Sequence, residues 1–357
     1  MKKKIKVLHI VSSYDPSEGG PPISINNIAY SLRNSKNIEN SLLTSISTIG
    51  KIKFFKKTNL EKLFLKKFYI PNFSMIFKIK NEIKKSQIIH LHNFWNFTIF
   101  VSLFFGIIYK KKIILTPHGS FDIYNMRKSY LKKYIYLFFF GNYQISKIHG
   151  FHFLTNQEKQ NSFYKKNKKN IIISNFSKKI SNIPKLKLDK SKINFCYLGR
   201  LDKIKNLDYQ IKLINELNKK IDVNFNIIGP DYGAKQELIN LVEKLNLKNI
   251  VKFKSPIYNS KKYSWLKYSD FVLLTSHYEC NSILALETLA CGGCLITNNK
   301  TNLNYLKKYK VVQFVGQNVF KSSKKIIKII QNKKFNFLQR RNSLYFTKKY
   351  NEIYFKN

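Results

Sequence analysis

The chain has 357 residues, 44% of them hydrophobic, which is too long for one compact core and predicts two domains. It carries 65 Lys and Arg against 19 Asp and Glu, a formal net charge of +46, which predicts attraction to anionic lipids, nucleic acids or sugar nucleotides. The longest apolar stretch, 97–109, is too short to span a bilayer and predicts a buried or interfacial helix.

Short β-branched runs alternate with helical stretches along the whole chain, a pattern typical of parallel sheets covered by helices. The first series of strands is predicted at 6–14, 86–94, 111–119, 148–156 and 170–176. The polar, basic segment 178–192 lacks apolar periodicity and predicts the linker between domains. The second series of strands is predicted at 193–198, 223–230, 250–255, 270–276, 294–298 and 311–316, with closing helices at 317–331 and 336–355. We therefore expect two doubly wound α/β domains that bind ligands beyond the carboxyl ends of their strands, in a cleft.

A Gly-Gly pair follows the first predicted strand and opens a helix that has Pro22 in its first turn. Gly19 and Gly20 would let the backbone approach a ligand near the N–H groups of a helix N-terminus, although an ordinary turn has the same composition. The pair does not belong to a GxGxxG motif, so a nicotinamide site is not expected.

The loop GRLDKIKN follows the first strand of the second series. Arg200 offers a planar fork of donors and Lys205 a point charge, a combination that suits a diphosphate. Arginine is scarce in this chain, so Arg200 is the more informative of the two.

Two carboxylates lie in the stretch YECNSILALETLACGGCLIT, with Glu279 in a loop and Glu287 inside an apolar helix. Paired carboxylates at a site suit the hydroxyls of a ribose or hexose. Cys291 and Cys294 have CxxC spacing, but no second ligand pair supports zinc, and the two glycines between them predict a helix C-cap before a buried strand. The sequence therefore assigns the chemistry to the carboxylates and a structural role to the cysteines.

Histidines close two of the strands predicted in the first domain. We expect His90 and His92 to point to opposite faces of their strand and so not to converge on a metal. His118, in the TPHG segment at the end of the next strand, is the better candidate for the site.

In this order, the motifs resemble glycosyltransferase family 4, retaining enzymes of the GT-B fold, over nearly the whole chain. GGPPISINNIAYSL is similar to the family's Gly-Gly loop and helix, GRLDKIKN to its GRLxxxKN loop, and ECNSILALE to its E-x7-E motif. IIHLHNFWN and TPHGSFDIYNMRKSYLKK are similar to a bacterial surface-polysaccharide subgroup, and FTKKYNEIYFKN to the family's last helix. The resemblance implies an acceptor-side domain at 1–185, a nucleotide-sugar-binding domain at 186–335, and a helix at 336–357 that crosses back to the first domain.

The resemblance also implies the role of each site residue. Arg200 and Lys205 would hold the diphosphate, Glu287 the ribose hydroxyls, and Glu279 the hydroxyls of the donor sugar. His118 would lie beside the transferred sugar, and Gly19 and Gly20 near the phosphates or the acceptor. No metal or other cofactor is expected, because Arg, Lys and helix N-termini would stabilise the leaving group.

One loop departs from the family pattern. The family usually reads E-G-F-G where this chain has Glu279, Cys280, Asn281 and Ser282. We count Cys280, Asn281 and Ser282 as donor-binding, since Asn and Ser suit a helix N-terminus, and expect them to alter donor choice or weaken binding.

The implied reaction transfers a hexosyl-type sugar from a nucleotide diphosphate sugar, UDP first and GDP next, to a saccharide or lipid-linked acceptor in surface polysaccharide or lipopolysaccharide assembly. The four scattered cysteines and the lack of an export signal favour the cytoplasm, at the inner face of the membrane. Basic clusters at 51–67, 110–112, 127–133 and 165–169 suit an anionic membrane surface. The alternatives are a sugar-nucleotide epimerase of the same fold and a non-catalytic nucleic-acid-binding protein, although no nucleic-acid-binding motif is present.

Overall fold

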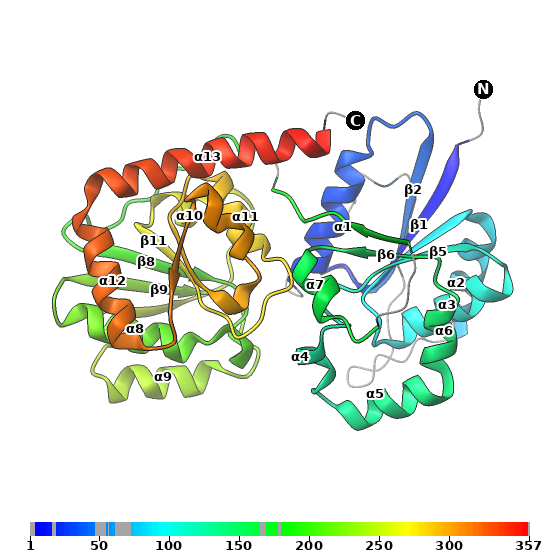
Figure 1. Cartoon of the computed structure of the whole chain (residues 1–357), viewed down its shortest axis with the longest axis horizontal. Helices are drawn as coiled ribbons and strands as arrows, with labels where there is room; N and C mark the ends of the chain where they lie inside the picture. Colours follow the sequence, from blue (N-terminus) through cyan, green and yellow to red (C-terminus); the bar gives the residue numbers. More distant parts are fainter. Residues whose placement is uncertain are drawn as a thin grey trace. The chain divides into compact units, whose positions relative to one another are not determined.

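The computed structural model describes residues 4–15, 19–46, 55, 57–60, 73–164, 169–177 and 180–355 (Figure 1). The chain divides into two compact units, Met1–Asn175 and Phe176–Asn357. This division lies ahead of the residue 185 at which we placed the end of the first domain. Residues 180–189, within the expected linker, form neither helix nor strand.

Unit 1 is built on a parallel seven-stranded sheet in the order β3-β2-β1-β4-β5-β6-β7. Its strands are β1 (Ile5–Ser13), β2 (Ile38–Ile46), β3 (Lys57–Leu60), β4 (Ile88–His92), β5 (Lys112–Thr116), β6 (Gly150–Phe153) and β7 (Lys169–Ile172). Its helices are α1 (Gly20–Ser31), α2 (Phe73–Lys85), α3 (Phe97–Ile108), α4 (Ile123–Met126), α5 (Tyr130–Tyr136), α6 (Asn142–Ser146) and α7 (Asn156–Asn161), with a π-helical turn at Leu137–Gly141. The order reverses between β1 and β4, so the ligand-binding switch point of this doubly wound sheet lies at their carboxyl ends.

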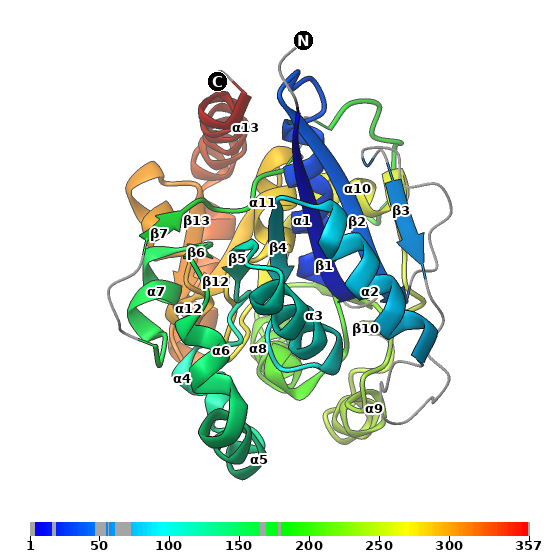
Figure 2. The same ribbon diagram turned by 90° about the vertical axis from the view of Figure 1, so that its right-hand side faces the viewer.

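The alternation of side chains along β1 separates two parts of the unit 1 core. Leu8 and Ile10 pack into the large cluster that contains residues of α2 and α3, two helices that lie over the sheet in Figure 2. Val11 points the other way, into a smaller cluster with Ile25 and Ala29 of α1. His9 shares the face of Val11, because residues two apart in a strand lie on the same side.

Unit 2 is built on a parallel six-stranded sheet in the order β10-β9-β8-β11-β12-β13. Its strands are β8 (Ile193–Leu198), β9 (Val223–Ile228), β10 (Val251–Lys254), β11 (Phe271–Leu274), β12 (Leu295–Asn298) and β13 (Val312–Val315). Its helices are α8 (Leu207–Asn218), α9 (Lys235–Lys244), α10 (Asn259–Tyr268), α11 (Ile283–Ala290), α12 (Val319–Gln331) and α13 (Lys333–Phe355). The switch point here lies between β8 and β11.

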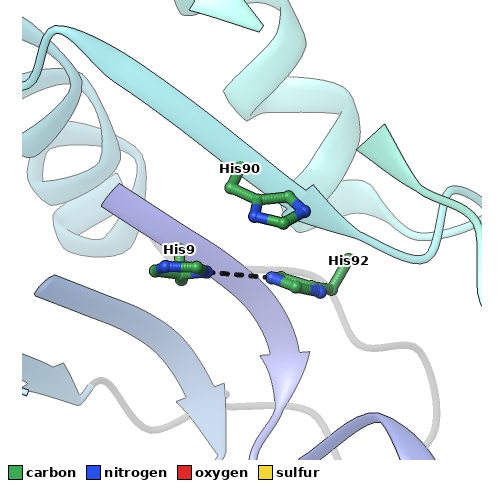
Figure 3. Close-up of side chains that lie close together, drawn as sticks. All are labelled: His9, His90 and His92. Atoms are coloured by element: carbon green, nitrogen blue, oxygen red, sulfur yellow. Dashed lines mark hydrogen bonds between the residues drawn. The ribbon is translucent and has the colours of Figure 1, made fainter. Parts of the chain in front are cut away.

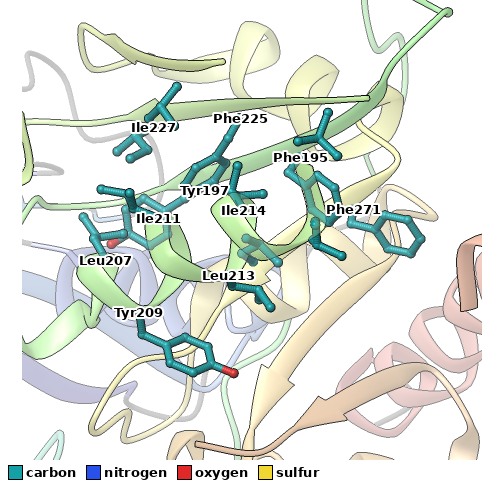
Figure 4. Packing of buried hydrophobic residues seen from close by; sticks show 14 of the residues in the cluster. Phe195, Tyr197, Leu207, Tyr209, Ile211, Leu213, Ile214, Phe225, Ile227 and Phe271 are labelled. Carbon is teal, nitrogen blue, oxygen red and sulfur yellow. The ribbon is translucent and has the colours of Figure 1, made fainter. Parts of the chain in front are cut away.

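Both faces of the unit 2 sheet are buried. Phe195, Tyr197 and Phe271 join side chains of α8 on one face (Figure 4). Cys196 and Val272, one residue out of phase, join side chains of α10 and α11 on the other face. A sheet buried on both faces needs strands that are apolar almost throughout. For this reason, the strands of unit 2 could be predicted from the sequence.

The last helix, α13, packs on α11 within unit 2. The guanidinium of Arg340 donates to the carbonyls of Lys267 and Ser269, each at 2.9 Å, at the end of α10. It also donates to the carbonyl of Gly292, 3.3 Å away, just after α11. One side chain of α13 therefore binds the unpaired carbonyls at two helix ends.

The predicted doubly wound α/β class is confirmed in both units. Strands β2 and β3 were not predicted, because they carry Asn, Ser and Lys in place of an uninterrupted apolar run. Among the described residues, no helix combines the length and the apolar character needed to cross a bilayer. Of the basic clusters, 51–67 and 165–169 lie largely outside the described residues.

Candidate active site

The loops after β8 and β11 meet at the switch point of unit 2. The His277 amide donates to the Ile204 carbonyl at 2.8 Å, and the side chain of Asn206 donates to the Thr275 carbonyl at 3.1 Å. Asn206 adopts a left-handed conformation with φ of 55°, which Asn tolerates better than most residues. These bonds hold two segments about seventy residues apart in sequence against each other.

Lys205 and Glu279 lie in these two loops and form an ion pair. The Lys205 Nζ is 2.7 Å from Oε1 of Glu279, and the two side chains are only 17% and 12% exposed. The Ser276 hydroxyl donates to the same carboxylate oxygen at 2.7 Å. A predicted phosphate-binding cation and a predicted sugar-binding carboxylate are thus in direct contact.

Arg200 follows β8, where the ends of β8 and β9 pack closely together. Its guanidinium lies over the Tyr232 ring, 4.8 Å from the centroid, and its carbonyl accepts from the Tyr197 hydroxyl at 3.0 Å. Burial raises the pKa of Tyr197 well above its usual value, with Glu279 adding to the effect and Arg200 opposing it, so this hydroxyl lies within the field of both. A Cβ at Gly229 would lie 1.8 Å from the Gly199 carbonyl oxygen, so glycine is required there.

Glu287 lies in the buried helix α11 and forms a second ion pair. Lys262 of α10 donates to its Oε1 at 2.6 Å. The Ser282 hydroxyl caps α11 by accepting from the Ala285 amide at 3.4 Å, which confirms that Ser282 suits a helix N-terminus. Asn281 is buried beside it, and Cys280 is partly exposed.

The cysteines have the structural role that we predicted. Cys291 and Cys294 are buried free thiols, and burial raises the pKa of both, to about 12 for Cys291. Gly292, with φ of 69°, ends α11 as the expected C-cap glycine. Cys294 directly precedes β12, and its carbonyl accepts from the Val272 amide of β11 at 2.8 Å.

The Gly-Gly pair of unit 1 begins α1 as predicted. Gly19 has φ of 97°, a conformation that favours glycine, and a Cβ on it would meet no atom within 4 Å. Gly20 is the first residue of α1, followed by prolines in its first turn. The backbone at Gly19 is therefore open to approach at a helix N-terminus.

The expectation that His90 and His92 diverge is wrong. Residues two apart in a strand share a face, and the two rings stack with centroids 4.4 Å apart. His9, which is paired with His90 across β1 and β4, joins them, with its Nδ1 3.1 Å from Nε2 of His92 (Figure 3). One ring nitrogen from each of the three lies within 4.8 Å of the other two.

His118 extends this cluster to the loop after β5. Its Nε2 lies 3.1 Å from Nδ1 of His92, and its φ of 51° is left-handed. The buried Glu158 carboxylate accepts from the amides of Gly119 and Leu154, each at 2.6 Å, and so fixes the loop. Burial lowers the pKa of His118 to about 3, with a smaller effect of His152, so the ring is neutral at pH 7.

Sequence reasoning missed Lys262, Glu158, His9 and His152. A lysine among 65 basic residues carries no signal of its own, and the partner of Lys262 comes twenty-five residues later. His9 did leave a signal, because it interrupts the apolar run VLHIV of a predicted strand. A polar side chain on the buried face of a strand needs polar neighbours, and three more histidines supply them.

A known family model covers the part of the chain that contains these loops. Residues 178–344 match the family model of Glycosyl transferases group 1, a stretch that contains Arg200, Lys205, Glu279 and Glu287. This stretch of unit 2 is therefore similar to group 1 glycosyltransferase domains. The match supports the predicted enzyme class, a glycosyltransferase.

The curated relatives that match this chain are distant. Over 232 residues, 61% of this chain, it is 29% identical to an uncharacterized 41.2 kDa protein in the cps region of Klebsiella pneumoniae, covering 62% of that protein. Over 112 residues, 30% of this chain, it is 29% identical to D-inositol 3-phosphate glycosyltransferase of Paenarthrobacter aurescens (strain TC1), covering 28% of that protein. The matched stretches therefore span less than two thirds of either relative.

The fold is shared over nearly the whole chain with the Anabaena protein HepE, solved in complex with UDP and glucose. The TM-score is 0.74 at 15% identity, over 97% of this chain and 95% of HepE. The GT-B fold class is therefore confirmed.

Proposed function

We propose that the protein is a retaining glycosyltransferase that moves a hexosyl-type sugar from a nucleotide diphosphate sugar to a saccharide or lipid-linked saccharide. The observation that carries this proposal is the contact of Lys205 with Glu279 at the switch point of the glycosyltransferase domain. A cation that suits a diphosphate and a carboxylate that suits sugar hydroxyls lie side by side, as a bound sugar diphosphate requires.

The ion pairs indicate how a donor would be received. The diphosphate would take Lys205 and Arg200 as partners, and Glu279, released from Lys205, would accept hydrogen bonds from sugar hydroxyls. Glu287 would do the same for ribose hydroxyls once Lys262 moves away from it. The sugar would lie against the loop formed by Cys280, Asn281 and Ser282. Each carboxylate is held in place by a lysine until the donor arrives.

Gly19, Gly20 and His118 are the proposed contributors from unit 1. Gly19 exposes its backbone at a helix N-terminus, which suits an anionic group. His118 is proposed to contact the transferred sugar as a neutral imidazole that donates or accepts one hydrogen bond. Charge on the leaving diphosphate would be stabilised by Arg200 and Lys205, without a metal.

The donor base and the pathway rest on the comparisons. The solved complex of HepE contains UDP, which supports UDP as the first donor base to test, with GDP next. The relative in a cps region supports a role in surface polysaccharide assembly. The donor base and the pathway are more specific than the enzyme class, and both are part of this proposal.

The donor site is tested by thermal unfolding of the full chain with UDP, GDP, ADP, CMP and their sugars, repeated with Glu287→Gln. A ligand at one hundred times its Kd stabilises the folded state by about 2.7 kcal/mol. We expect one diphosphate class to raise the Tm of the wild type. The Glu287→Gln variant loses a charged acceptor and should bind that ligand roughly 10- to 100-fold more weakly, because hydrogen bonds to charged groups contribute about 1.5–3 kcal/mol.

Glu237→Gln is the matched control. Glu237 pairs with Lys203 in the same unit, but both side chains are exposed, so this variant should bind the donor as the wild type does. If no nucleotide raises the Tm of the wild type, or if both variants respond equally, the assignment of the donor site is wrong.

A further inference from the structure

Three histidines converge on the face of the unit 1 sheet that α1 covers. His9 and His90 are paired across β1 and β4, and His92 lies two residues beyond His90 on the same side. Ring centroids are 5.0 Å apart for His9 and His90, and 5.4 Å for His9 and His92. Figure 3 shows the three rings facing a common space. Nothing in the proposed sugar transfer uses this cluster apart from its contact with His118.

The hydrogen bonds around His90 determine which of its nitrogens carries the proton. His152 Nε2 donates to the Ile173 carbonyl at 2.8 Å, so in the neutral ring its Nδ1 accepts from the Thr116 hydroxyl, 3.0 Å away. The Thr116 oxygen must then accept from His90 Nε2, 2.7 Å away. His90 Nδ1 is left with a free lone pair, as a metal ligand requires.

His9 and His92 each have one nitrogen toward the cluster and one toward an outer polar group. His92 Nδ1 faces His118, and its Nε2 lies 3.1 Å from Nδ1 of His9. Two nitrogens bound to one tetrahedral zinc at about 2.0–2.1 Å would be about 3.3 Å apart. The outer nitrogen, His9 Nε2, and Asn40 Oδ1 are both buried, and the Asn40 side chain lies within hydrogen-bonding reach of the His9 ring. A proton on His9 Nε2 would serve both atoms and free Nδ1 for a ligand role.

We propose that His9, His90 and His92 bind one Zn²⁺ ion, through Nδ1, Nδ1 and Nε2. Imidazole ligands favour zinc and the neighbouring late first-row metals, and three of them leave a fourth position open. The outer partners, Asn40, Thr116 and His118, orient the rings in the way that polar groups around metal sites orient histidine ligands. The ion would join β1 to β4 within the sheet of unit 1 and fix His92, the ring that contacts His118.

The test uses the full chain, purified without an oligohistidine tag, stripped with a chelator and titrated with Zn²⁺ against a chromogenic zinc indicator. We expect about one equivalent to bind with Kd below about 1 μM, and His9→Gln to weaken binding at least about 10- to 100-fold. His149→Gln, at an exposed histidine of the same unit, is the matched control and should bind as the wild type does.

Cobalt provides a second readout that does not depend on the folding of a variant. Co²⁺ added to the stripped wild type should give the visible absorption of a tetrahedral nitrogen site, and Zn²⁺ should abolish it. The proposal is overturned if the wild type binds no stoichiometric Zn²⁺, if Co²⁺ gives no such absorption, or if the two variants bind equally. None of these readouts involves a sugar donor, so their failure leaves the proposed transferase reaction untouched.

Discussion

Lys205 and Lys203 lie two residues apart, yet their ion pairs are in different environments. Lys203 pairs with Glu237 at the surface, where such contacts contribute about 0–1 kcal/mol because water and salt screen them. Lys205 pairs with Glu279 where both side chains are mostly buried, so loss of one partner leaves a charge that water reaches poorly. The two lysines therefore provide a matched comparison within one loop.

We expect Lys205→Met to raise KM for the nucleotide sugar by roughly 10- to 100-fold, because a charge-assisted contact to the diphosphate is lost. Lys203→Met should leave KM within about twofold of the wild type. Steady-state kinetics with the donor found by the thermal panel measure both. Equal effects of the two changes would show that Lys205 does not contact the donor.

The buried thiol of Cys196 allows a prediction of how the free energy of unfolding changes at alkaline pH. Burial raises the pKa of its thiol from 9.0 to about 12 in the folded state. Between these values the unfolded chain loses the proton and the folded chain keeps it, so the stabilisation present below pH 9 is lost as pH rises. The free energy of unfolding should fall by up to about 1.4 kcal/mol per pH unit relative to Cys196→Ser. The prediction is wrong if urea titrations show the same pH dependence of the free energy of unfolding for the wild type and the variant.

The sequence predicted that the residues after the strands gather at one edge of the sheet, and the structure brings Lys205 and Glu279 into contact there. It did not reveal the partner of Glu287. Lys262 reaches Glu287 from another helix, and such contacts depend on packing that periodicity does not encode. The error at His90 and His92 had a different origin, since strand periodicity places those two rings on one face and we applied it wrongly.

At the scale of elements, α5, the π-helical turn and α6 expose an unusual amount of apolar surface. Phe138 is 72% and Phe139 65% exposed, and Tyr130 and Tyr134 are equally open. Phe139 and Phe140 also line a hollow of about 290 Å³ with Phe104 and Tyr143. Lysines of the 127–133 cluster flank this surface. Apolar side chains beside basic ones suit insertion into an anionic membrane interface, which we propose for this segment.

We expect the double change Phe138→Ser and Phe139→Ser to weaken binding to vesicles that mix phosphatidylglycerol with phosphatidylcholine by at least about tenfold, since each ring buries substantial apolar area in the interface. Vesicle sedimentation at low and high salt measures this, and high salt should release the wild type. Phe77→Ser, at an exposed ring on α2, is the control. Binding that neither salt nor the double change reduces would exclude an electrostatic membrane surface here.

At the scale of the molecule, each unit has its own sheet and its own buried clusters. The charged side chains proposed for the diphosphate and the ribose belong to unit 2. A nucleotide without its sugar should therefore stabilise that unit in particular, because ligand stabilisation acts on the cooperative segment that forms the site.

Hydrogen exchange of the full chain should show this directly. With saturating nucleoside diphosphate, we expect slower exchange in the loops after β8 and β11 and in α11. The strand amides of β4 and β5 should not change. Protection restricted to unit 1 would show that we have assigned the nucleotide to the wrong unit.

Arg340 follows all the described strands of both sheets in the chain, and its contacts bear on the order in which the fold is completed. The helix that carries Glu287 is followed by Gly292, whose carbonyl Arg340 binds, and a Cβ on Gly292 would lie 3.1 Å from the side chain of Leu344. During synthesis, the sheet strands of both units emerge from the ribosome before these residues do. A nascent chain therefore lacks the support of α11 until its last helix is made. Premature termination shortly before α13 would yield a protein with complete sheets and an unsupported α11.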